Sequence, residues 1–295
     1  MATFYEYNSP TYYGVNLFAL GFWRRYAGSA RLRELGAHME AALWRDIATF
    51  YHPGLRNLCG PFMRAYGMDM TRYASLLGLC IWGVVGREAA PFPDVTGSFG
   101  HAADVAMGPC LAVVGIEPPA DVVRGLTVFG GERRINRLIA DEPGRPVTAW
   151  VAPTVMVGAE EVIPRGVPVD DCRLSWFSEL GRQYHPLTVH WRTTTGGVGT
   201  LRLLSGGPVA ARVDGPTVLL AALPAYRPAE WVFQVTLPDG CAPPDFVSLC
   251  WRLDGLQVML EGAESPPSVL AVAGGWQVTL PPHTLLMNLL PYPTA

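Results

Sequence analysis

The hydrophobic pattern of the chain changes its period near residue 145, and this change limits the possible folds more than any other feature. Before it, apolar residues recur every three or four positions, as on helices buried along one side. After it, short runs alternate between apolar and polar residues. The 295 residues are enough for two ordinary domains. The sequence therefore predicts a helical domain over residues 1–143 and an antiparallel β-sandwich over residues 146–295.

Helices are expected in five places in the first half, at about residues 15–27, 30–50, 69–85, 101–114 and 120–129. The clearest begins after Ser29, a plausible N-cap, and carries apolar residues at steps of three and four until Pro53-Gly54 ends it. Gly- or Pro-containing loops follow the helices, so antiparallel helical hairpins are the simplest arrangement.

Strands are expected throughout the second half. Runs such as LTVHWRTT, EWVFQVTL and GWQVTLP recur every eight to fifteen residues, with Gly, Pro and Asp between them. This spacing of short alternating runs is typical of an antiparallel β-sandwich.

Lysine is absent, since all 22 basic residues are arginine. Proteins that need a lysine amine are thereby excluded: P-loop nucleotide hydrolases, Schiff-base and pyridoxal-phosphate enzymes, and kinases. The net charge of −3 argues against a nucleic-acid partner. The most apolar stretch, residues 74–85, is too short to cross a bilayer, so no membrane partner is expected.

Metal and cofactor motifs are also missing from the sequence. The six cysteines show no CxxC spacing, and no dinucleotide-binding GxGxxG follows a predicted strand. His101 and Asp104 have the only metal-like helical spacing, and they lack a third ligand. We therefore expect neither a metal nor a cofactor.

The first candidate cluster runs from Tyr5 to Gly14 and holds four tyrosines, Glu6 and Asn8 directly before an apolar helix. Thr11 is a possible cap for this helix. A helix N-terminus favours an anion or a developing phenolate. The alternative is a helix-entry segment whose tyrosines pack at a domain interface.

The second cluster lies in the loop between two predicted helices and includes His52, Arg64, Tyr66 and Asp69. Loops of about fifteen residues in compact folds are usually functional. Asp69 has a structural alternative as the N-cap of the next helix, and His52 as a C-cap of the preceding one. Arg64 is harder to explain structurally, because a buried arginine needs an anionic partner.

The third cluster lies in the second half, where His185 stands before a strand that carries His190 and Arg192 on one face. A single histidine in a β domain is more often structural than catalytic, and the polar residues around His185 change this only modestly.

The run Glu6-Tyr7-Asn8-Ser9-Pro10-Thr11-Tyr12-Tyr13 resembles the catalytic-tyrosine segment of the α/α-toroid polysaccharide lyases of the alginate lyase and heparinase II/III type. These enzymes place an incomplete toroid of helical hairpins before an antiparallel β-sandwich. The resemblance implies a partial toroid followed by a sandwich, and β-elimination on a poly- or oligosaccharide that contains uronic acid.

The resemblance places Tyr12, or its neighbour Tyr13, at the family tyrosine that acts as base or acid. Elimination also needs a group that neutralises the uronate carboxylate. On chemical grounds Arg64 and His52 are assigned to the carboxylate, and His185 to a catalytic histidine from the sandwich. Glu6, Asn8, Tyr66 and Asp69 complete the predicted substrate contacts.

The sequence departs from these lyases because about half of their toroid, with an Asn-His pair, precedes the tyrosine segment. Here that segment begins at residue 5, so a shortened toroid with an open apolar face is expected to self-associate or bind a partner. No signal peptide is visible, which predicts a cytoplasmic location, or a secreted or periplasmic one if the N-terminus is truncated.

Two alternatives to a lyase follow from the same architecture. A toroid-type glycoside hydrolase needs two facing carboxylates, for which Glu6 and Asp69 are the only pair to nominate. A non-catalytic carbohydrate-binding or scaffold protein would keep the fold and its aromatic surface without activity.

Overall fold

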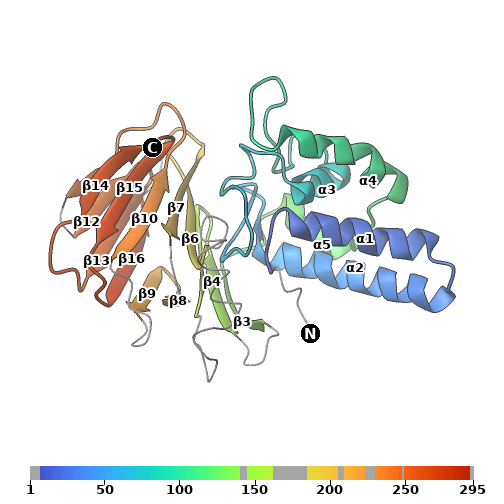
Figure 1. Cartoon of the computed structure of the whole chain (residues 1–295), viewed down its shortest axis with the longest axis horizontal. Helices are drawn as coiled ribbons and strands as arrows, with labels where there is room; N and C mark the ends of the chain where they lie inside the picture. The colour runs from blue at the N-terminus through green and yellow to red at the C-terminus, as the bar shows by residue number, and fades with distance from the viewer. Residues whose placement is uncertain are drawn as a thin grey trace. The chain divides into compact units, whose positions relative to one another are not determined.

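The computed structural model describes residues 7–139, 145–161, 185–204, 209–222, 230–247 and 249–292. The chain forms two compact units. The helical unit comprises Asn8–Leu58 and Arg64–Gly130, and the sheet unit comprises the described residues of Met1–Tyr7, Cys59–Met63 and Gly131–Ala295. Helices in the N-terminal part followed by antiparallel sheets confirm the predicted α-then-β order (Figure 1).

The helical unit contains α1 (Tyr12–Tyr26), α2 (Ala30–Phe50), β1 (Tyr51–His52), β2 (Asn57–Leu58), α3 (Leu76–Val85), the 3-10 helix η1 (Ala102–Met107), α4 (Gly108–Val114) and α5 (Ala120–Thr127). Ser29 caps α2 as predicted, because its side chain accepts a hydrogen bond from the Leu32 amide. The prediction for the third helix was wrong at its start. The helix begins at Leu76, where Ser75 accepts from the Gly78 amide and caps it.

The packing of α1 against α3 depends on Gly14. A Cβ atom at this position would lie 2.4 Å from the Leu76 carbonyl carbon and 2.5 Å from the Leu77 nitrogen. No side chain fits at such distances, so the glycine sets how closely the two helices approach.

We expect Gly14→Ala to lower the free energy of unfolding by about 1–3 kcal/mol, because the new methyl group meets helix backbone that cannot rotate away. Chemical denaturation with circular dichroism measures the change. Gly108→Ala is the matched control, since Gly108 also lies in a helix but has no atom within 4 Å of an added Cβ. Equal stability of the two variants would contradict this account of the α1–α3 contact.

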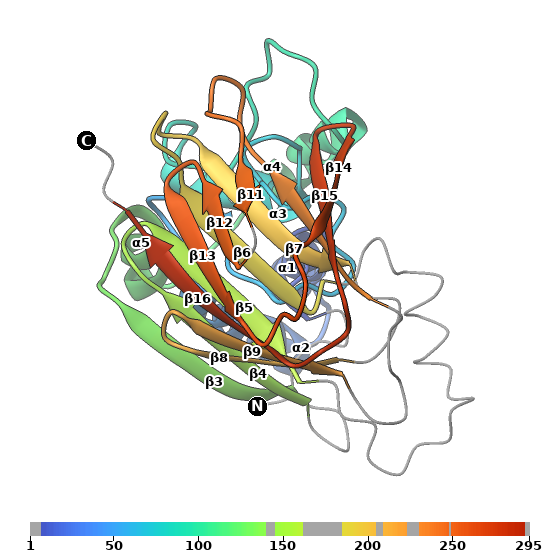
Figure 2. The ribbon, with the colours of Figure 1, turned by 90° about the vertical axis from the view of Figure 1, so that its left-hand side faces the viewer.

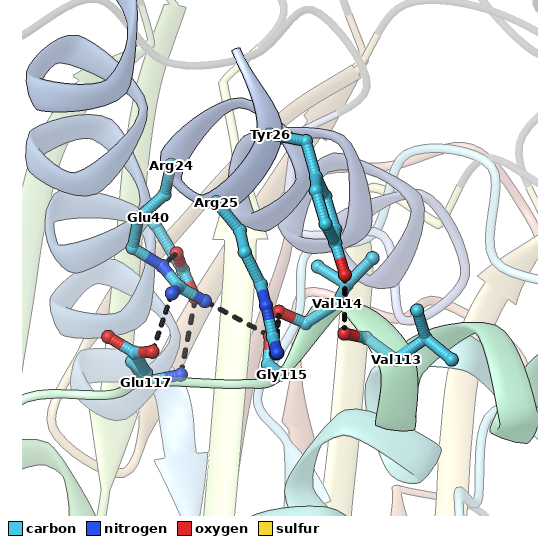
Figure 3. Close-up of polar contacts among 8 residues, drawn as sticks. All are labelled: Arg24, Arg25, Tyr26, Glu40, Val113, Val114, Gly115 and Glu117. Atoms are coloured by element: carbon cyan, nitrogen blue, oxygen red, sulfur yellow. Dashed lines mark hydrogen bonds and ion pairs between the residues drawn. The ribbon is translucent and has the colours of Figure 1, made fainter. Parts of the chain in front are cut away.

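The C-terminal end of α4 is held by side chains from the end of α1 (Figure 3). Three carbonyl groups there accept side-chain hydrogen bonds: Val113 from Tyr26 at 3.1 Å, Val114 from Arg25 at 3.3 Å and Gly115 from Arg24 at 3.1 Å. The last carbonyls of a helix lack partners within the helix. These contacts therefore satisfy groups that α4 leaves open and fix α4 to α1.

The sheet unit contains one eight-stranded and one six-stranded antiparallel sheet, in the orders β14-β15-β10-β7-β6-β5-β4-β3 and β11-β12-β13-β16-β9-β8. Their strands are β3 (Arg133–Ile139), β4 (Arg145–Val151), β5 (Val155–Glu160), β6 (Leu187–Arg192), β7 (Val198–Leu204), β8 (Val209–Asp214), β9 (Thr217–Ala222), β10 (Trp231–Thr236), β11 (Asp245–Val247), β12 (Cys250–Leu253), β13 (Leu256–Glu261), β14 (Ser268–Val272), β15 (Gly275–Leu280) and β16 (Leu285–Pro291). The first of them, β3, lies ahead of the boundary expected near residue 145.

Alternate residues of both sheets form one hydrophobic core. On β10, for example, Trp231, Phe233 and Val235 are buried in this core, while the residues between them are less buried. Figure 2 shows the strands of the smaller sheet in front of β5, β6 and β7 of the larger one. The two sheets therefore pack as two layers, as the period-2 pattern of the second half predicts.

The segment Cys59–Met63 lies on the opposite, outer face of the large sheet. Phe62 and His185 exchange two main-chain hydrogen bonds, at 3.0 and 2.9 Å. A Cβ atom on Gly158 of β5 would lie 1.7 Å from the Gly60 carbonyl oxygen. This close approach explains why glycine occupies the middle of a buried strand.

No helix in the described part of the chain combines the length and the apolar character that a bilayer crossing requires.

Candidate functional site

The start of α1 is tied to the loop that follows β2 by the side chain of Ser9. Its hydroxyl accepts a hydrogen bond from the Tyr12 amide at 3.1 Å and donates one to the Arg64 carbonyl at 3.0 Å. Thr11, the expected cap, makes no side-chain hydrogen bond to the helix. Ser9 therefore performs the capping and also brings Tyr12 and Arg64, far apart in sequence, to the same place.

Tyr12, Arg64 and Tyr66 form the centre of the candidate site. The hydroxyl oxygens of Tyr12 and Tyr66 are 3.2 Å apart, and the Arg64 guanidinium carbon lies 4.5 Å from the centre of the Tyr12 ring. Arg64 holds a left-handed backbone conformation, with φ of 53°. Such a conformation is uncommon for a non-glycine residue and is often found at functional sites.

His101 extends this group, and we call Tyr12, Arg64, Tyr66 and His101 the tyrosine–arginine cluster. The His101 ring centre lies 5.0 Å from that of Tyr66, and its Nδ1 is 3.8 Å from an Asp104 carboxylate oxygen. It also has a left-handed backbone, with φ of 57°. From the sequence, His101 was a candidate only as a metal ligand, because nothing in its local pattern connects it with Tyr66.

Tyr73 lies beside the cluster, with its ring centre 6.0 Å from that of His101. Burial raises the pKa of its hydroxyl far above the usual value, and the negative charges of Asp69 and Asp104 raise it further. Among the described residues this hydroxyl has no hydrogen-bond partner. Tyr73 therefore stays a neutral phenol and cannot act as the base of this site.

Tyr13 and Asn8 are buried in the packed interior. The Tyr13 hydroxyl donates a 3.0 Å hydrogen bond to Asp46, and both its ring and the Asn8 side chain are buried. Asn8 has a φ of 54°, which asparagine tolerates better than most residues. The hydrogen bond to Asp46 gives Tyr13 a structural role, and of the two neighbouring tyrosines only Tyr12 belongs to the cluster.

His52 and Asp69 organise the loop between α2 and α3. The buried His52 ring stacks on Phe129 and its Nδ1 accepts a hydrogen bond from the Leu55 amide. One Asp69 carboxylate oxygen accepts from the Asn57 side chain at 3.0 Å and from the amide and hydroxyl of Thr71 at 2.9 and 2.6 Å. Asp69 thus closes a turn and does not cap a helix, and neither residue joins the cluster.

Two of the predicted residues remain. His185 belongs to the sheet unit, where it is buried and its Nε2 lies 3.0 Å from Nη1 of Arg202. Glu6 lies outside the described residues. Within the part of the chain that the structure describes, no three His, Cys, Asp or Glu side chains are grouped so as to hold a metal ion.

Comparison with family models matches residues 1–115 to a domain of unknown function, DUF8769. All four residues of the tyrosine–arginine cluster lie within this range. Comparisons with curated proteins and with solved structures found no match. The comparisons therefore indicate no function for the chain.

Proposed function

We propose that the protein is carbohydrate-active and performs a lyase-like β-elimination on a uronic-acid-containing glycan at the tyrosine–arginine cluster. The observation that carries the proposal is the placement of the Arg64 guanidinium against the Tyr12 ring, whose hydroxyl is 3.2 Å from that of Tyr66. The cluster combines one cation with two hydroxyl groups that can exchange protons with the same ligand.

The elimination requires a base, an acid and a cation. Tyr12 as phenolate takes the proton from C5 of the uronate, the electron pair forms the C4–C5 double bond, and the C4–O bond breaks. The departing oxygen takes a proton from the Tyr66 hydroxyl. Arg64 balances the negative charge of the carboxylate and of the enolate-like state that forms during proton removal.

In this proposal His101 acts on Tyr66, the residue beside which it lies. It is partly exposed and faces the Asp104 carboxylate. In this role it would orient the Tyr66 hydroxyl and return a proton to it after each turnover. The helical hairpin of α1 and α2 that presents Tyr12 is, in this proposal, one part of an α/α toroid. Glu6 remains a proposed substrate contact, and self-association remains a prediction.

A glycoside hydrolase is less well supported, because it needs two carboxyl groups about 5–10 Å apart across the substrate. Of the nominated pair, Asp69 has one carboxylate oxygen that already accepts three hydrogen bonds from Asn57 and Thr71, and Glu6 lies outside the described residues. A binding protein without activity would use the same aromatic cluster, and the assay below separates it from an enzyme.

Incubation of the full chain with alginate, heparan sulfate and pectic polymers tests the proposal. We expect the ultraviolet absorbance of an unsaturated uronate to increase with at least one polyuronate and not with dextran, which has no carboxylate. New reducing ends without this absorbance would indicate hydrolysis. A folded protein that binds but leaves every polymer intact would overturn the enzymatic proposal.

A further inference from the structure

Arg202 on β7 carries a partly buried positive charge on the outer face of the large sheet. Its Nε and Nη2 donate to the side-chain oxygen of Gln234, and its Nη1 donates to His185 at 3.0 Å. Among the described residues it forms no ion pair. A charge removed from water without an ionic partner is costly, so its retention calls for an explanation.

Both protein partners of Arg202 are neutral. Arginine can only donate hydrogen bonds, so His185 accepts through Nε2 and carries its proton on Nδ1. Gln234 is an amide. Burial lowers the pKa of Arg202 to about 10, which still leaves the guanidinium protonated at neutral pH. The group of three residues therefore has a net charge of one positive unit.

The Arg202 guanidinium also has N–H groups that make no hydrogen bond to the described residues. Of its five N–H groups, three are used by Gln234 and His185. The two that remain can bind the oxygens of a planar anion. Strand register holds the arrangement in place, because Arg202 lies directly opposite Thr188 on one side and Gln234 on the other.

We infer that Arg202, His185 and Gln234 form a binding site for the carboxylate group of a ligand. A carboxylate has one negative charge and balances the single guanidinium, whereas phosphate at neutral pH brings more charge than the site can compensate. Gln277, opposite Gln234 on the neighbouring strand β15, places a further polar side chain on the same outer face. A sugar acid, with hydroxyl groups around its carboxylate, fits this surface.

This inference does not depend on elimination chemistry and would stand if the protein had no activity. Isothermal titration calorimetry of the full chain with glucuronate, glucose and inorganic phosphate tests it. We expect saturable binding of glucuronate, no binding of glucose and weaker binding of phosphate. Equal binding of glucose and glucuronate, or tighter binding of phosphate, would overturn the inference.

Substitutions locate the site. Arg202→Met should weaken glucuronate binding about ten- to hundredfold, the loss expected for a hydrogen-bonded charge. Arg202→Lys keeps the positive charge but lacks the paired N–H donors of the guanidinium. Its affinity for glucuronate should lie between those of the wild type and Arg202→Met. Arg212→Met is the control, since Arg212 is exposed on β8 of the smaller sheet. Binding that survives Arg202→Met but disappears in Arg64→Met would assign the carboxylate to the tyrosine–arginine cluster and refute the Arg202 site.

Discussion

Replacement of Tyr12 by phenylalanine is expected to lower kcat for polyuronate elimination by about 100-fold or more, the usual effect of removing a general acid–base group. The substitution removes one oxygen atom and keeps the ring that contacts the Arg64 guanidinium. KM should change little, because the proposed mechanism assigns the carboxylate to Arg64, which the substitution leaves in place. The initial rate of unsaturated-product formation across a range of substrate concentrations gives both constants.

Tyr26→Phe is the matched control for this result. Tyr26 lies on the same helix, and its hydroxyl binds the Val113 carbonyl, away from the cluster. We expect wild-type kcat from this variant, and from Tyr13→Phe as well if it remains folded. A Tyr12→Phe protein with full activity would remove Tyr12 from the mechanism, and a large loss in Tyr13→Phe alone would transfer the role to its neighbour.

The two halves of the fold could be predicted from periodicity because each pattern depends on local geometry. The steps of three and four after Ser29 and the alternation along β10 directly reflect which side of each element is buried. The start of α3 was missed because two capping residues, Asp69 and Ser75, precede the same apolar run. Only the hydrogen bonds to Thr71 and Gly78 show which of them caps the helix.

The candidate site was only partly predictable for a different reason. Tyr12, Arg64 and Tyr66 attract attention by their chemistry, but their meeting depends on the Ser9 hydrogen bonds to two separate segments. His101 and Arg202 reach their partners through tertiary contacts that leave no local pattern. His52 shows the reverse error, since a histidine in a polar loop looked functional but is buried against Phe129.

Removal of the Glu40 carboxylate is expected to destabilise the protein by about 1–3 kcal/mol, because Arg24 and the Glu117 amide both lose a buried hydrogen-bond acceptor. Glu40 is 2% exposed on α2, and its oxygens accept hydrogen bonds from Arg24 at 2.7 Å and from the Glu117 amide at 3.3 Å (Figure 3). Glu40→Leu fills the volume, but of the two carboxylates that pair with Arg24 it leaves only that of Glu117, which is exposed. Urea denaturation of the variant and of the wild type measures the difference.

The control for Glu40→Leu is Glu34→Leu, because Glu34 is exposed on the same helix and its loss should change stability by less than about 0.5 kcal/mol. A second test adds Arg24→Met to Glu40→Leu. In the single variant the largely buried Arg24 keeps only the exposed Glu117 carboxylate as an ion-pair partner. The double variant removes this cation, so it should regain part of the lost stability. Full recovery is not expected, since the Gly115 carbonyl also loses its hydrogen bond from Arg24 and the end of α4 is left with one fewer partner. If Glu40→Leu is no less stable than Glu34→Leu, the ion pair does not hold α1, α2 and α4 together.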